Sequence, residues 1–216
     1  RKGISWSALC IIPSMAVLIT CSFPIVQSLM QHGQFNAADS AMLAQVLSLY
    51  SLGLFSFTLY LFLNRVFYSL QDTKTPMALN FTGNAFNSLF NLMAINKLGV
   101  NGLALGHAAA YTLIAGLSLW LISSRIKEIK LLALLPVFLK TAAASALVGL
   151  MGWGFSLLWQ RWISSGIFGP KIFYLAALLL LLGAAYLGLA RLFRISELME
   201  MFKMLRPAAK PEEPKL

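Results

Sequence analysis

Residues 172–190 read IFYLAALLLLLGAAYLGLA and contain no charged side chain. A helix rises about 1.5 Å per residue, so this stretch is long enough to cross the hydrocarbon core of a bilayer. On its N-terminal side, five further uncharged stretches occupy 3–38, 40–64, 75–96, 98–124 and 141–160. Lipid offers no hydrogen-bond partners, so each stretch must satisfy its backbone internally as a helix. The sequence therefore predicts an all-α membrane protein, a polytopic bundle of about six transmembrane helices.

The distribution of basic residues predicts the orientation of these helices. The formal net charge is +10, which in a water-soluble chain would suggest nucleic acid or an acidic partner. With residue 1 in the cytoplasm and six spans, only Lys97, Arg161 and Lys171 fall outside, and Lys140 lies within a span, where its ammonium can snorkel to the headgroups. Basic residues favour the cytoplasmic side of membrane proteins. We therefore expect a multi-pass protein of the bacterial cytoplasmic membrane with both ends of this chain in the cytoplasm.

Three segments are expected. The basic stretch 123–130 separates four transmembrane helices, within 1–130, from a terminal transmembrane helix pair, within 131–195. Residues 196–216 are rich in proline and charge, which predicts a cytoplasmic tail that is partly disordered.

Prolines and short loops mark the expected ends and kinks of the helices. Pro13 and Pro24 are expected to kink the first span. The pair Thr75 and Pro76 predicts an N-cap and a first-turn proline, so the third span should start at Pro76 after a tight cytoplasmic turn. Only residues 96–101 separate spans three and four, which forces these two spans to be antiparallel neighbours.

Four asparagines of the third span form the most informative pattern. Asn80, Asn84, Asn87 and Asn91 are spaced by four, three and four residues, so they share one stripe of the helix. An amide facing hydrocarbon loses hydrogen bonds, so the stripe should face other helices or a water-filled cavity. Both interpretations stay open: the amides either join helices to one another or line a polar cavity.

His107 is the one histidine inside an expected span. A buried imidazole can relay protons or help to hold an ion, and equally it can be a neutral group hydrogen-bonded to a neighbouring helix. Nearby, Gly102 and Gly106 form a G-x-x-x-G pair, which favours close helix packing.

Several function classes lack the residues they need. None of the seven carboxylates lies deep in an expected span, so paired acid–base catalysis has no obvious site, and we expect no catalytic residue and no enzyme. The two histidines and two cysteines never come within metal-ligand spacing, so neither a metal nor a cofactor is expected. Nucleic-acid binding is also not expected, because the aromatic residues do not interleave with a basic patch.

The stretch Arg65–Pro76, RVFYSLQDTKTP, is followed by the asparagine-rich span and by Gly102–His107, GLALGH. This arrangement resembles the MurJ (MviN) family, whose members flip lipid II, the undecaprenyl-linked precursor of peptidoglycan. The resemblance covers essentially the whole chain. It implies a two-lobed transporter of fourteen helices, of the multidrug/oligosaccharidyl-lipid/polysaccharide exporter type, with this chain supplying helices nine to fourteen.

The resemblance also implies partners and sites. The partners would be lipid II, membrane lipids and the missing N-terminal helices of the same protein, with no nucleic acid. The hydrophobic groove of the terminal pair would receive the polyprenyl tail. The cations that grip the pyrophosphate come mainly from earlier helices. The asparagine stripe would line the lobe's inner surface, and Arg65, Asp72 and Lys74 would belong to a cytoplasmic gate.

Some family members bind sodium, and Asn87, Asn91, His107 and the backbone of Leu103 fall where those ligands would lie. The family has a carboxylate and a threonine where this sequence has Asn91 and His107. Loss of a carboxylate removes the strongest ligand for a hard cation, so a tight sodium site is not expected, and a proton-linked or potential-driven cycle becomes the more open question. The expected function is therefore lipid II flipping by alternating access. The alternatives are an exporter of drugs or other lipid-linked oligosaccharides, and a membrane scaffold for cell-wall enzymes that transports nothing.

Overall fold

The computed structural model describes residues 2–125, 135–163 and 168–193. Within them the chain is helical, with α1 (Lys2–Thr20), α2 (Ser22–Met30), α3 (Ala37–Ser51), α4 (Leu54–Ser69), α5 (Lys74–Leu98), α6 (Val100–Arg125), α7 (Leu135–Leu158), the short π-helix η2 (Trp159–Ile163) and α8 (Phe168–Leu192). The predicted tail 196–216 lies outside the described residues. The division of the chain near residue 130 stays a prediction.

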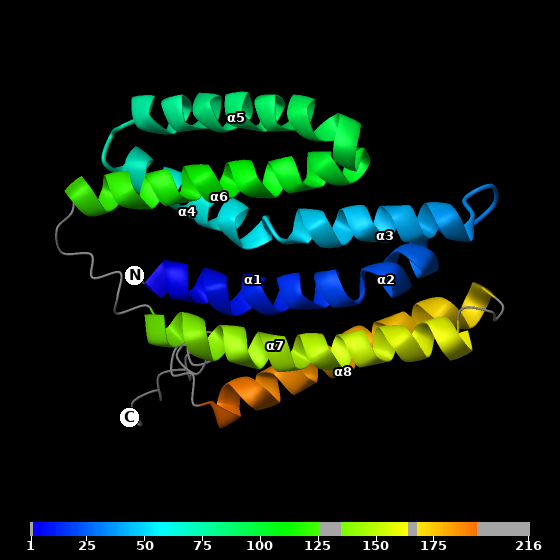
Figure 1. The fold of residues 1–216 in the computed structure, drawn as a ribbon. Coiled ribbons are helices and arrows are strands. Elements are labelled where there is room, and N and C mark those ends of the chain that lie inside the picture. The colour runs from blue at the N-terminus through cyan, green and yellow to red at the C-terminus, as the bar shows by residue number, and fades with distance from the viewer. Residues whose placement is uncertain (1, 126–134, 164–167, 194–216) are drawn as a thin grey trace, which may run out of the picture.

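Six rods of helix lie side by side, because α1 continues into α2 and α3 continues into α4 (Figure 1). Their order across the bundle is α5, α6, α3–α4, α1–α2, α7 and α8. We call the end of the bundle that carries the start of α1, the α4–α5 turn and the end of α6 the Lys2 end. The opposite end carries Asn36 and the α5–α6 turn, and we call it the Asn36 end.

By length and composition, four helices of the described chain can cross a membrane, and the bent α3–α4 pair would be a fifth span. Helix α5 is 25 residues long but is not among them. Its asparagines lower its hydropathy, although it packs lengthwise against α6 (Figure 1). An all-α membrane bundle is confirmed, and α5 differs from the other spans in polarity.

The helix breaks differ in detail from those expected. Pro13 lies inside α1, and the first rod breaks at Cys21, three residues before Pro24. The second rod, expected as one helix, bends by 42° between Ser51 and Leu54. Gly53 lies in this bend against α6, where an added Cβ would come 2.7 Å from the Cα of Ala108. The bend therefore accompanies a close backbone contact that the sequence does not reveal.

The start of α5 also corrects an expectation. The N-cap is Thr73, so the helix begins at Lys74, and Thr75 is not the cap. Its side chain instead donates to Asp72, whose carboxylate satisfies the free amide of Thr75. At the other end of α5, only Gly99, with φ of 55°, separates it from α6. The expected antiparallel hairpin is thus confirmed, with a turn shorter than predicted.

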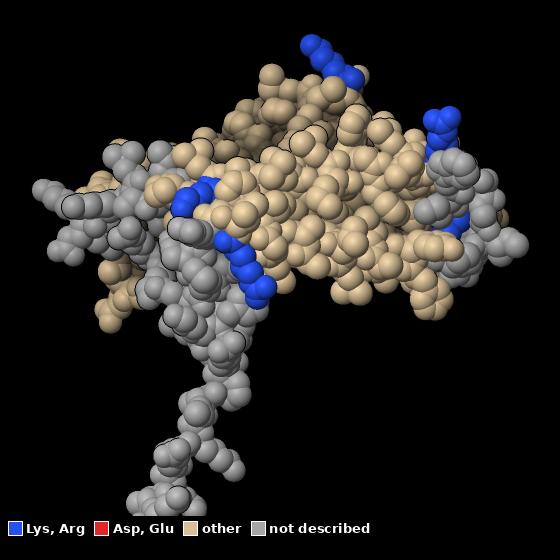
Figure 2. Space-filling view, turned by 90° about the horizontal axis from the view of Figure 1, so that it is seen from below, with Lys and Arg blue, Asp and Glu red and all other residues tan. Residues whose placement is uncertain are grey.

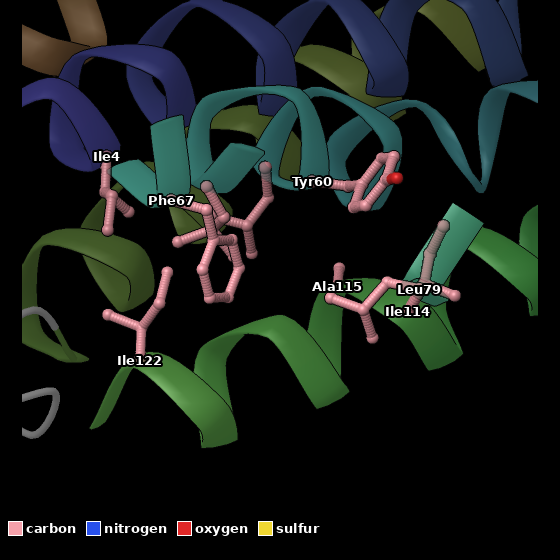
Figure 3. Packing of buried hydrophobic residues seen from close by; sticks show 9 residues of the cluster. Ile4, Tyr60, Phe67, Leu79, Ile114, Ala115 and Ile122 are labelled. Atoms are coloured by element: carbon pink, nitrogen blue, oxygen red, sulfur yellow. The ribbon is translucent and has the colours of Figure 1, made fainter. Parts of the chain in front are cut away.

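Two apolar clusters join the rods. The first cluster links α1, α4, α5 and α6, and Figure 3 shows Ile4, Phe67 and Ile122 converging from three different helices. The second cluster links α1, α7 and α8 around Leu9, Val148 and Leu182. Seen from the α7–α8 side, a broad surface without charged side chains separates lysines and arginines toward its edges (Figure 2). Such an uncharged belt is what a bilayer requires.

Candidate functional site

The asparagine stripe of α5 divides into two pairs. Asn80 and Asn84 are exposed, and the Asn84 amide donates a hydrogen bond of 2.7 Å to the Asn80 side-chain oxygen. Asn87 and Asn91 are half-buried, and their side-chain oxygens are fully buried without a described hydrogen-bond partner. The N-terminal pair of the stripe, Asn80 and Asn84, is therefore open to the surroundings of the bundle. The C-terminal pair, Asn87 and Asn91, faces α6.

Gly106 of α6 makes room for the buried pair. An added Cβ at Gly106 would lie 3.1 Å from the Asn87 Oδ1 atom and closer still to the Asn91 Oδ1 atom. Gly102, one turn earlier, lies against Ala94 in the same way. The expected close packing at the G-x-x-x-G pair is thus confirmed, and at Gly106 the atoms that come close include the two amide oxygens. Unsatisfied oxygens in a buried site favour a donor or a small cation.

The structure does not join His107 to this pair by any described contact. Its ring stacks on Tyr50 of α3 with centroids 4.1 Å apart, and the Tyr50 hydroxyl lies 3.2 Å from its Nδ1 atom. The rings of Phe57 and Tyr111 also contact the His107 ring, so three aromatic side chains surround it. His107 therefore bonds to a neighbouring helix, which is one of the two interpretations left open by the sequence.

The three gate candidates have different surroundings at the Lys2 end. Arg65 and Lys74 are exposed. Asp72 instead accepts hydrogen bonds from the Thr75 amide at 2.9 Å and the Thr75 hydroxyl at 2.6 Å, and it pairs with Arg125 at 2.5 Å. Sequence reasoning missed Arg125 as a partner, because 53 residues separate the pair and no local pattern connects them.

The same contacts fix the charge of Asp72. Hydrogen bonds from Thr75 first, and then from the Arg125 guanidinium, hold the pKa of the Asp72 carboxyl far below its usual range. The carboxylate is therefore ionised at every pH at which the protein would work.

An apolar groove of about 830 Å³ lies between α1 and α8. Its walls include Cys10, Pro13 and Ser14 of α1 and Gly183 and Leu187 of α8. Of α7, only Val148 reaches it. The sequence directed attention to the terminal pair of spans, whereas this groove has the first span as one wall. Pro13 is the feature of the sequence that could have pointed to α1 as a wall of the groove. A proline leaves the carbonyl four residues earlier, that of Leu9, without its helix donor.

Within the described residues, no group of three or more histidine, cysteine, aspartate or glutamate side chains could hold a metal ion.

Comparison with known proteins relates this arrangement to one family. The family model described as "Lipid II flippase MurJ" matches residues 1–174. A solved structure, the lipid II flippase MurJ in an inward closed conformation, superposes with a TM-score of 0.67 at 25% sequence identity. The superposition covers 88% of this chain and 37% of that one.

Curated relatives give the same result. The probable lipid II flippase MurJ of Synechocystis sp. is 30% identical over 161 residues, which is 74% of this chain and 30% of the relative. That of Buchnera aphidicola subsp. Schizaphis graminum is 34% identical over 108 residues, or 50% of this chain and 21% of the relative. This chain thus matches less than a third of the length of each of these two relatives. With the helical bundle described above, these matches lead to one conclusion: the chain is a multi-pass membrane protein and belongs to the MurJ family.

Proposed function

We propose that this chain forms six helices of a lipid II flippase of the bacterial cytoplasmic membrane, with its Lys2 end in the cytoplasm. The superposition of 88% of the chain on a MurJ structure carries the proposal. The activity is alternating access: two lobes open in turn to the two sides of the membrane, and the lipid crosses without covalent chemistry. The remaining helices, which would include the other lobe, come from the rest of the protein.

Asn80 and Asn84 line the transport cavity in this proposal. Both are exposed, and they lie on the N-terminal half of the asparagine stripe. Linked amides offer donors and acceptors to the sugar and peptide groups of a headgroup without fixing them in place, because each neutral hydrogen bond has a modest net free energy.

Asn87 and Asn91 have a second role here, as ligands of a coupling ion. Their buried oxygens lack described partners, and oxygen ligands suit a hard cation. His107 follows Gly106 directly and lies in an aromatic surround instead. It is therefore the candidate for a proton-linked step, with Tyr50 as its hydrogen-bond partner.

The groove between α1 and α8 is the proposed site of the polyprenyl tail. Its walls are mostly aliphatic, and within the bilayer a hydrocarbon tail would be held against them by van der Waals packing, because the tail is not transferred out of water. Arg65 and Lys74 are the proposed gate residues, since both present exposed cations at the Lys2 end. Their partner at the Lys2 end would be an anionic group of the other lobe or of the substrate.

The test reconstitutes the full-length protein in vesicles and measures the transfer of lipid II between leaflets. Asn84→Leu should slow transfer at least about fivefold, the effect of losing about 1 kcal/mol of hydrogen bonding in the rate-limiting state. The matched control is Thr82→Leu. Thr82 is exposed on the same helix and lies about 200° around the axis from Asn84.

Three other outcomes would each reject part of the proposal. Equal transfer by both variants would remove the cavity role of Asn84. Transfer of other lipid-linked oligosaccharides but not of lipid II would indicate an exporter of different specificity. No transfer at all by the folded, unmodified protein would leave the scaffold alternative.

A further inference from the structure

Three helix ends meet at Asp72. Helix α4 ends just before it, α5 begins just after it, and Arg125 at the end of α6 pairs with it. The guanidinium reaches two groups at once, since its second nitrogen donates to the Thr75 hydroxyl at 3.2 Å. That hydroxyl itself donates to Asp72, so the three side chains form a closed ring of polar contacts.

The backbone of the α4–α5 turn is built to deliver Asp72 to these donors. The Gln71 amide bonds to the Tyr68 carbonyl and the Asp72 amide bonds to the Phe67 carbonyl, at 3.0 Å each. This pair of bonds is a Schellman motif, which needs a left-handed residue at the position of Gln71. Gln71 has φ of 59° although it is not glycine. A side chain in this region costs about 1–2 kcal/mol, so the surrounding contacts must hold the turn.

Phe67, near the end of α4, contacts both the Asp72 backbone and the Arg125 side chain at this corner, where α4, α5 and α6 meet. It is fully buried in the first apolar cluster, and its ring lies 5.8 Å from the Arg125 guanidinium carbon. Its carbonyl accepts the Asp72 amide. The corner is therefore anchored in the packed core of the bundle, and its ion pair does not stand alone on a mobile surface.

Because its carboxylate is already bound by Thr75 and Arg125, Asp72 is not available to form an ion pair with another lobe. The hydrogen bonds from Thr75 and the pairing with Arg125 keep the pKa of this carboxyl far below its usual range. Protonation therefore does not open the corner at physiological pH. If Arg125 moved away, the Asp72 carboxylate would lose its ion-pair partner. The turn would then keep the backbone strain at Gln71 without the contact to Arg125 that helps to offset it.

Resting on the proposed flippase function, we propose that Asp72 and Arg125 form a clasp that stays closed throughout the transport cycle, so that the ends of α4, α5 and α6 move as one body. Arg125 is thus a positioning residue. Of the three hairpin charges, only Arg65 and Lys74 face outward and act as a gate.

The first test distinguishes a permanent clasp from a contact that opens. In full-length protein with every cysteine, including Cys10 and Cys21, replaced by alanine, Asp72→Cys and Arg125→Cys are combined, and lipid II transfer is measured before and after a short bis-maleimide joins them. Before cross-linking, transfer should fall about threefold to fivefold, as expected for the loss of an exposed ion pair. After cross-linking, transfer should recover most of that loss. The reagent should change nothing in the single Asp72→Cys variant.

Two results would overturn the proposal. If cross-linking lowers transfer further, the two residues must separate during the cycle. If the double variant transfers lipid II as fast as its cysteine-free parent, the pair has no part in transport.

The second test is independent of transport. Thermal unfolding in detergent is compared for Asp72→Asn, Arg125→Gln and the double variant, with Arg191→Gln as the control at the end of α8. The double variant should have the same Tm as the single variant with the lower Tm, because either substitution already breaks the clasp. Additive losses would overturn the clasp. If the unmodified protein moves no lipid II, the proposed function fails, and this cycle alone decides whether the clasp exists.

Discussion

The hydroxyl of Tyr186 on α8 donates a hydrogen bond of 2.8 Å to the backbone carbonyl of Leu9 on α1. Pro13 stands four residues after Leu9 and has no amide hydrogen, so the helix itself cannot satisfy this carbonyl. In a bilayer, water is not there to replace the missing donor. Tyr186 thus supplies what Pro13 removes, and this bond joins the two walls of the apolar groove.

Tyr186→Phe should lower the free energy of unfolding by about 1 kcal/mol, because the Leu9 carbonyl loses its donor. In a Pro13→Ala background, the alanine amide can reach Leu9, so the same tyrosine substitution should have little effect. Unfolding of the four proteins in detergent measures this difference. An equal loss in both backgrounds would show that the tyrosine acts through packing and not through the freed carbonyl.

Gly106→Ala should destabilise the α5–α6 hairpin by about 1–3 kcal/mol, the usual range for overpacking. The new Cβ would press on the side-chain oxygens of Asn87 and Asn91. Gly116→Ala on the same helix is the control, because nothing lies within 4 Å of its added Cβ, and it should be neutral or slightly stabilising. Thermal unfolding compares the two variants. Combining Gly106→Ala with Asn91→Ala should recover most of the loss, and no recovery would place the strain elsewhere.

Gln71→Gly should stabilise the protein by about 0.5–1 kcal/mol. The position has φ of 59°, which glycine adopts without a steric penalty and glutamine does not. Gln71→Ala keeps the Cβ and should give no such gain. A rise in Tm for both variants would mean that the gain comes from the lost polar side chain and not from the backbone.

The contribution of Asp72 to stability should depend on pH only in acid. Its pKa is lowered in the folded protein, so its stabilising effect is present above the unfolded pKa of about 4 and is lost as the pH falls below that value. The Tm difference between the parent protein and Asp72→Asn should therefore be constant from pH 5 to 8. It should shrink when the pH is lowered below about 4. A difference that already falls between pH 7 and 5 would contradict an ionised carboxylate held by Thr75 and Arg125.

The parts of the site that the sequence could predict are those with a local pattern. The spacing of Asn80, Asn84, Asn87 and Asn91 was enough to put them on one stripe, but not to show that the stripe divides at α6 into an exposed and a buried pair. The G-x-x-x-G pair predicted close packing, but not its occupants. For His107 the sequence left two interpretations, and its neighbour Tyr50 is 57 residues away.

That this chain is a bundle of membrane helices with one amide stripe could be predicted from the sequence. Both properties follow from the order of charged, apolar and amide residues along single helices, because a helix satisfies its own backbone and fixes its own faces. Which faces meet is visible in the packed fold alone: Arg125 contacts Asp72 across 53 residues, and Tyr186 contacts Leu9 across 177. Those partners depend on how the rods pack and how the α3–α4 pair bends, and a pattern within one helix carries no information about the helix beside it.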